Sequence, residues 1–164
     1  MNAEQKHWVQ ASFEAISPIA ETVAQVFYTR LFELDPGLRP LFRGDLAVQG
    51  RALMHMLRVV VNRLDEPDQL IPMVQALGQR HAHYGVQEAH YGLVGQALLY
   101  TLEQGLGPAF TDEVRDAWAA AYALLASVMQ DAAHALVATG THAHATASRG
   151  SPTVARRLDP SGRA

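Results

Sequence analysis

The stretch GQRHAHYGVQEAHYG, residues 78–92, holds three histidines and two tyrosines in fifteen positions. His81 and His83 are separated by a single residue. If this part of the chain is helical, side chains two residues apart point in very different directions, because each residue turns the helix by about 100°. The first question is therefore which of the two imidazoles faces the protein interior.

Residues 68–84 are predicted to form a helix with one apolar stripe. With Leu77 set at 0°, His81 falls at about 40° and Tyr84 at about −20°, both on the apolar side. His83 falls at about 240°, among the polar residues. We therefore expect His81 and Tyr84 to face inward and His83 to face solvent. The other members of the stripe are Leu70, Met73 and Val74.

The first 138 residues are predicted to be helices separated by breaking residues, which makes the fold class all-α. Ser17 is the expected N-cap of a second helix, with Pro18 in its first turn. Thr111 is the expected cap of the last helix, and the segment LRPLF before residue 43 is expected to be a turn. The predicted helices cover about 8–16, 17–34, 49–64, 68–84, a segment beginning near 91, and a segment beginning at 111.

The length of 164 residues, with 49% hydrophobic and 18% charged residues, predicts one globular domain with a sizeable core. We place that domain at residues 1–138. Residues 139–164 are rich in small and polar residues and are expected to be a flexible, disordered tail.

Charge and composition exclude several classes of protein. The chain has no cysteine, so disulfides, thiolate metal sites and cysteine nucleophiles are absent. Residues 1–139 carry nine basic and fifteen acidic side chains, which argues against nucleic acid as a partner. The N-terminus lacks the pattern of a secretory signal, and no apolar run approaches the roughly 20 residues of a membrane span. We expect a cytoplasmic protein without a membrane partner.

An inward histidine at position 81 has two interpretations. Such residues are more often core histidines satisfied by a hydrogen bond than ligands to a metal or cofactor. A two-histidine zinc site would need both imidazoles on one helical face, which His81 and His83 do not share. His90 lies at a helix entry and is expected to bond locally. If His81 is a ligand, the remaining possibility is the single axial imidazole of a haem iron.

Two polar residues elsewhere fit the edge of a buried pocket. Gln49 lies four residues before Leu53 and extends an apolar stripe with an amide, although polar residues are also common near helix starts. Tyr28 lies at the edge of the buried face that carries Phe27. Its hydroxyl would either reach water or need a partner inside a pocket.

Together these segments resemble the bacterial single-domain globins, which are similar to the Vitreoscilla-type haemoglobins and to the haem domain of flavohaemoglobins. The strongest likeness is to the high-affinity globins of methanotrophs, and it runs from about residue 4 to 138. The matching segments are FYTRLFELDPGLRPLF (27–42), QGRALM (49–54), GQRHAHYGV (78–86), HYGLVGQALL (90–99) and AWAAAYALLASVM (117–129).

The resemblance implies a globin fold, a three-on-three helical sandwich around haem b. It implies that His81 is the proximal ligand of the iron. The flavohaemoglobin glutamate that joins the proximal tyrosine falls at Ala133 here, and Asp131 lies on another side of the helix. The other implied site residues are Phe42 on the haem face, Tyr28, Gln49 and Leu53 on the distal side, Tyr91 beside the proximal imidazole, and Val86 and Val94 in the haem wall.

The resemblance also implies gas ligands, namely O₂, NO and CO. Reversible, high-affinity O₂ binding is the leading hypothesis, because Tyr28 and Gln49 can donate hydrogen bonds to a ligand that becomes partly negative when it binds. One alternative is a nitric oxide dioxygenase, which would depend on a separate reductase because we find no flavin or nicotinamide module. The second alternative is a haem-based gas sensor whose tail contacts a partner. No residue is assigned as catalytic with certainty, and we expect a monomer or weak dimer.

Overall fold

The computed structural model describes residues 1–147, with side chains through residue 140. The described residues form helices and contain no strand, which confirms the all-α prediction. In chain order the elements are α1 (Ala3–Ile16), η1 (Ser17–Ile19), α2 (Ala20–Leu34), η2 (Pro36–Leu41), α3 (Leu46–Asn62), α4 (Pro67–His83), α5 (Glu88–Leu106), η3 (Gly107–Ala109) and α6 (Asp112–Ala147).

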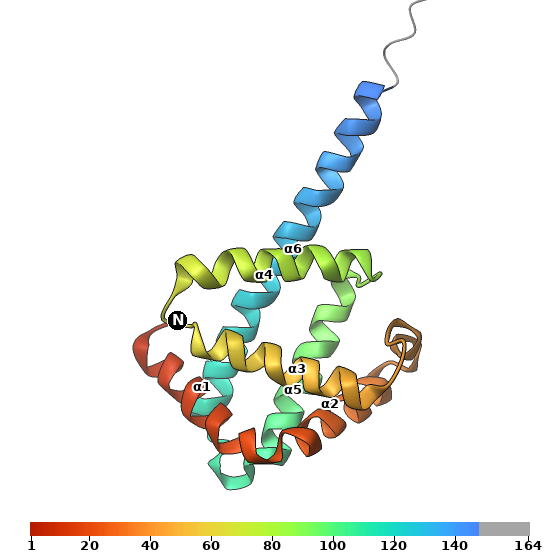
Figure 1. The fold of residues 1–164 in the computed structure, drawn as a ribbon. Helices are drawn as coiled ribbons and strands as arrows, with labels where there is room; N and C mark the ends of the chain where they lie inside the picture. Colours follow the sequence, from red (N-terminus) through yellow and green to blue (C-terminus); the bar gives the residue numbers. More distant parts are fainter. Residues whose placement is uncertain (148–164) are drawn as a thin grey trace, which may run out of the picture.

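The helices cross in two layers, with α1, α3 and α4 packed on α2, α5 and α6 (Figure 1). α3 and α4 run in opposite directions across the molecule, and α5 and α6 cross them. Gly78 permits a close crossing of α4 and α6, because a Cβ atom there would collide with the backbone of Met129 on α6. Gly50 plays the same part between α3 and α2, since its Cβ would lie 2.9 Å from the Ala24 Cβ.

The helix ends agree with the sequence at some positions and differ at others. Thr111 accepts from the Val114 N–H at 3.4 Å, so the predicted cap of the last helix is confirmed. Ser17 does not cap α2, because its hydroxyl donates to the Phe13 carbonyl at the end of α1 and the chain passes through a 3₁₀ turn first. α3 begins at Leu46, earlier than expected, because the Asp45 carboxylate accepts from the Ala47 N–H.

The last helix is longer than the sequence indicated. α6 continues to Ala147, so the expected boundary at residue 138 falls inside a helix, and Figure 1 shows its C-terminal part leaving the body of the protein. Residues 148–164, the rest of the expected tail, lie outside the described residues.

α6 also corrects the expectation that no segment has the length of a membrane span. By length and composition alone, Asp112–Gly140 is long and apolar enough to cross a membrane. The core helix of a globular protein meets the same test, and the N-terminal half of α6 carries Trp118 and Ala121, both 3% exposed. Core packing therefore accounts for part of the apolar character of α6, because only 22% of its most apolar window is buried.

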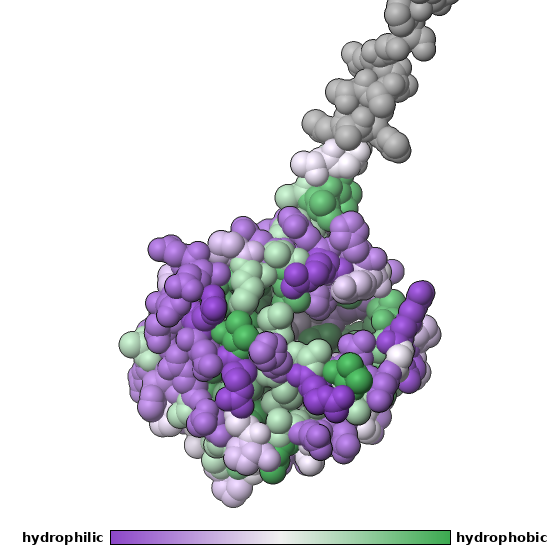
Figure 2. Space-filling view, in the orientation of Figure 1, coloured by the Kyte–Doolittle hydropathy of each residue, from purple (hydrophilic) through white to green (hydrophobic). Residues whose placement is uncertain are grey.

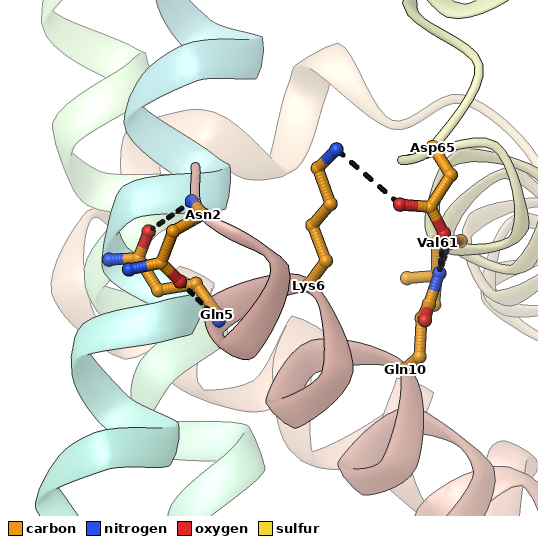
Figure 3. Close-up of polar contacts among 6 residues, drawn as sticks. All are labelled: Asn2, Gln5, Lys6, Gln10, Val61 and Asp65. Carbon is orange, nitrogen blue, oxygen red and sulfur yellow. Dashed lines mark hydrogen bonds and ion pairs between the residues drawn. The ribbon is translucent and has the colours of Figure 1, made fainter.

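Four polar contacts fix α1 on its neighbours. The indole N–H of Trp118 donates to the Ser12 hydroxyl at 2.8 Å and joins α6 to α1 inside the core. On the surface, Lys6 lies 3.4 Å from the Asp65 carboxylate (Figure 3). Gln10 donates both to Asp65 and to the Val61 carbonyl, each at 3.3 Å. These bonds hold α1 against the C-terminal end of α3.

Candidate functional site

A cavity of about 880 Å³ lies between α3 and α4 and is floored by α2, α5 and α6. Figure 2 shows a hollow in the surface of the body that is rimmed by hydrophilic residues and leads to hydrophobic ones. The described residues that border the cavity are mostly aliphatic and aromatic, and no aspartate or glutamate is among them. The predicted site residues all border it: Tyr28, Phe42, Gln49, Leu53, His81, Val86, Tyr91 and Val94.

His81 is the imidazole on the inner wall of α4, and it is half-buried. Its Nδ1 lies 2.9 Å from the carbonyl oxygen of Leu77, one helical turn earlier. Because a carbonyl oxygen can only accept, Nδ1 carries the proton and the Nε2 lone pair remains available. Burial lowers the pKa of His81, and the positive charge of Arg80 adds to this while the Leu77 bond opposes it. The lowered pKa favours the neutral imidazole, which is the form that binds a metal.

Near the end of α4, the neighbouring aromatic side chains of His81, His83 and Tyr84 lie in different environments. His83 is exposed, as predicted, and lies where the cavity opens. The prediction for Tyr84 is wrong: this side chain is 67% exposed, because the helix ends at His83 and Tyr84 leaves the helical periodicity. Gly85 then adopts a positive φ of 87°, and the Val86 N–H turns back to the His81 carbonyl at 3.1 Å. This turn brings Val86 to the cavity wall.

His90 has a local role, as the sequence indicated. α5 begins at Glu88, three residues earlier than expected, and the Gln87 N–H donates to the His90 Nδ1 at 3.0 Å. The Gln87 side chain in return accepts from the His90 main-chain N–H, which completes a capping box. His90 is thus occupied at Nδ1 by the start of α5.

Tyr28 lies on α2, on the wall of the cavity formed with α3. It is 6% exposed, and its hydroxyl donates to the main-chain oxygen of Gln49 at 3.3 Å. That distance is long for an O–H···O bond, so the bond is weak and a better acceptor can replace it. Burial raises the pKa of Tyr28 to about 12, which keeps the phenol a hydrogen-bond donor. The expectation that Tyr28 lies at the edge of the buried face understated its burial.

Aromatic packing holds Tyr28 in place. Its ring is in edge contact with Phe27, at 5.2 Å between centroids, and with Phe42, at 5.3 Å. Phe32 packs against Phe42 at 5.5 Å. Phe42 itself follows η2, where Arg39 donates to the Phe42 carbonyl at 2.7 Å. The segment before α3 thereby fixes Phe42 over the cavity.

Gln49 and Leu53 are neighbours on α3, one turn apart, and both are half-buried. The Gln49 side-chain amide has no hydrogen-bond partner among the residues that the structure describes. Tyr28, Gln49 and Leu53 therefore form one wall with two polar donors in an apolar surface, while His81 borders the same cavity from α4.

Tyr91 borders the same cavity as His81, from α5. The Tyr122 hydroxyl donates to the Tyr91 carbonyl, which fixes α5 on α6, and burial raises the pKa of both phenols. Ala133 is half-buried on α6 and offers no polar group, and Asp131 is exposed. Sequence reasoning missed the Leu77 carbonyl as the partner of His81, although its spacing of four residues on one helix would have indicated it.

The donor set and the cavity fit a haem group. A haem needs one neutral imidazole, apolar walls for its ring and an open side for a ligand, and these residues supply all three. His81 would hold the iron, and Phe42, Val86 and Val94 would contact the ring. The iron would supply the ligand-binding chemistry, and the surrounding side chains would exclude water and orient the ligand.

Comparison with known proteins agrees with this architecture. The family model described as Globin matches residues 25–129. The flavohemoprotein of Bordetella parapertussis is 34% identical over 141 residues, which cover 84% of this chain and 35% of that protein. The neuroglobin of Danio rerio is 33% identical over 143 residues, covering 79% of this chain and 90% of that protein. The chain spans about a third of the length of the flavohemoproteins that it matches.

Solved structures give the same fold. An engineered carbene transferase built on a candidate nitric oxide dioxygenase of Rhodothermus marinus superposes with a TM-score of 0.77 and 27% identity, covering 86% of this chain and 99% of that one. The bacterial globin of Campylobacter jejuni has a TM-score of 0.72 and 23% identity, covering 83% of this chain and 99% of that one, and supports the fold alone.

The fold and the site define a class of protein: a two-layer helical sandwich whose cavity fits a haem group. The chain belongs to the globin family and is a haem-binding protein of that family.

Proposed function

We propose that this globin binds O₂ reversibly at haem b, with His81 as the proximal ligand of the iron. The observation that carries the proposal is the buried Tyr28 hydroxyl beside Gln49, on the wall that faces a ligand. Both groups can donate a hydrogen bond to O₂. The absence of cysteine excludes c-type attachment of haem through cysteine thioethers, which agrees with haem b.

A hydrogen-bond donor in a dry pocket interacts more strongly with a polarised ligand than with a neutral one. Ferrous haem supplies an open coordination position for a diatomic ligand. A hydrogen bond to a charged or strongly polarised acceptor contributes about 1.5–3 kcal/mol, compared with about 1 kcal/mol for a neutral pair. O₂ becomes more negative than CO on binding, so Tyr28 and Gln49 favour O₂ and slow its release.

The test is to load the chain with haem and follow the Soret band during deoxygenation and re-oxygenation. A reversible spectral change with one O₂ per haem supports the proposal. His81→Gly, which removes the proposed ligand, should lose that change and regain a five-coordinate spectrum when imidazole is added. Loss of the Soret band in the unsubstituted chain, or unaltered spectra in His81→Gly, would contradict it.

A second candidate, nitric oxide dioxygenase, is supported by the likeness to the Rhodothermus marinus protein. It would need repeated reduction of the iron by a separate reductase. Nitric oxide consumption by the haem-loaded chain in air, with NADH and a general flavin reductase, separates the two functions. Many equivalents of NO consumed per haem favour the dioxygenase, whereas one equivalent followed by a stable ferric spectrum favours an O₂-binding protein.

A further inference from the structure

An open groove of about 500 Å³ lies between the start of α5 and the middle of α6. Tyr91 and Tyr122 border both this groove and the haem cavity, so they separate the two. Among the described residues, no lysine or arginine borders the groove. The other residues around it are small or polar: Glu88, Gly92, Ala123, Ala126, Ser127, Gln130, Asp131 and His134. The groove is therefore an acidic feature of the outer surface.

Beside the groove, α6 presents an exposed face of small side chains. With Ala123 set at 0° on the helix, Ala119 falls at about −40° and Ser127 at about 40°. All three are exposed, whereas Trp118 and Ala121 on the opposite side of α6 are buried in the core. Small side chains allow a second helix to approach to about 8 Å between axes. This face leaves room for another helix, and the charges around it indicate which one.

A pair of charged residues stands at each end of this face. At the C-terminal end, His134 Nε2 lies 4.0 Å from the Glu88 carboxylate at the groove. At the N-terminal end, the Arg115 guanidinium lies 2.8 Å from the Asp112 carboxylate. All four side chains are largely exposed, so their charges are available to a partner. Asp112 and His134 are each eleven residues from Ala123, in opposite directions along α6.

We propose that this face of α6 is the contact surface between two copies of the chain, which pair antiparallel about a two-fold axis at Ala123. In that arrangement His134, which is positive when protonated, faces the partner's Asp112. α5 flanks α6 on the side of Tyr122, at about −100°, and Arg115 falls on the same side at about −80°. The two-fold keeps this side in common, so the partner's Arg115 enters the acidic groove beside Glu88.

A second copy is the occupant because the face is complementary to itself, which a two-fold contact requires. The strip from Asp112 to His134 is about 33 Å long and one helix wide, so it buries on the order of 300 Å² per copy. Val137 is 67% exposed where α6 leaves the body (Figure 1), and it would lie beside the start of the partner's α6. On the other edge, Asp131 would lie near the partner's Asp116 and oppose the contact. We therefore expect a weak, concentration-dependent dimer, since stable interfaces bury about 800 Å² per partner.

The first experiment uses one introduced thiol, because the chain has no cysteine of its own. In the haem-loaded full chain, Ala123→Cys places a thiol on the two-fold axis, where the facing Cα atoms would be about 3.4–5.4 Å apart. This separation overlaps the range that a disulfide spans, so mild oxidation should give a linked dimer on a non-reducing gel. Ala119→Cys is the matched control on the same exposed face. Its two copies would lie about 12 Å apart and should stay unlinked.

Sedimentation velocity at rising protein concentration measures the same contact without a covalent bond. Arg115→Glu should weaken the dimer by about tenfold or more, because it sets a like charge against Glu88 of the other copy. Adding Glu88→Arg to that variant should recover most of the loss, which damage to the fold alone would not allow. Arg51→Glu is the matched charge control, at an exposed position on α3, and should leave the dimer unchanged.

Three results would overturn the pairing. Equal cross-linking of Ala119→Cys and Ala123→Cys would exclude a two-fold axis at Ala123. A dimer that Arg115→Glu leaves unchanged would exclude the charge contacts. A chain that is monomeric at every concentration, and whose groove instead binds an oligoarginine peptide, would assign this face to a different, basic partner. None of these results bears on the ligand of the haem, so the proposed function is tested separately.

Discussion

Replacing Tyr28 with phenylalanine removes one hydroxyl group from the cavity and leaves the aromatic packing in place. The ring is 6% exposed and stays in contact with Phe27 and Phe42, so the fold should tolerate the change. The bond that the hydroxyl now makes, 3.3 Å to the Gln49 carbonyl, is weak and contributes little to stability. The main effect should therefore appear on the ligand.

The size of the effect on O₂ dissociation follows from the loss of a single hydrogen bond to a polarised oxygen. Loss of about 1.5–3 kcal/mol from the bound state corresponds to about a ten- to hundredfold faster dissociation of O₂, at 1.4 kcal/mol per factor of ten. Stopped-flow displacement of O₂ by excess CO measures this rate directly. CO dissociation, measured by displacement with NO, should change much less, because CO gains less from a donor.

Tyr100→Phe is the matched control. Tyr100 is half-buried on α5, under the Arg30 guanidinium at 4.5 Å, and it does not border the cavity. Its O₂ dissociation rate should equal that of the unsubstituted protein. Equal rates for Tyr28→Phe and the unsubstituted protein, or an equal acceleration for O₂ and CO, would refute the assignment of Tyr28 as a donor to the ligand.

Three further changes test the fold around the site. Gly78→Ala should lower the free energy of unfolding, measured in urea, by about 1–3 kcal/mol, because the added Cβ would meet the Met129 backbone. The control Gly92→Ala, at an exposed position in α5, should raise it by about 0.5–1 kcal/mol. Equal effects of the two substitutions would show that α4 and α6 do not cross at Gly78. Between pH 10 and about 12 the native state keeps the Tyr28 proton that the unfolded chain loses, so the stability of the fold should fall as the pH rises through this window. Thermal melts at alkaline pH should show a smaller fall in Tyr28→Phe. Asp65→Asn removes a largely exposed ion pair with Lys6 and should cost only about 0.2–1 kcal/mol in the same urea assay, so a larger loss would indicate a stronger link between α1 and α3.

Helical periodicity predicted the inner and outer histidines of α4 because both lie within one regular element. His81 and His83 differ by two residues, and the geometry of a single helix places them on different sides. The same argument failed for Tyr84, three residues after His81, because the helix ends at His83 and the periodicity no longer applies. The prediction that Ser17 caps α2 failed for a different reason, because its hydroxyl donates to the Phe13 carbonyl of the preceding helix.

The sequence by itself determined the helical class, the inward face of each helix and the kinds of side chain that face the interior. These properties depend on residues within about one to five turns of one another, and a linear pattern records them. The meeting of Tyr28, Gln49 and His81 around one cavity was decided only by the tertiary structure. Their distances depend on how closely helices approach at Gly50 and Gly78, and each approach is set by a residue far away in the chain, Ala24 or Met129. The end of the cavity that Val9 borders has the same origin, because α1 meets α3, α4 and α6 only in the folded chain.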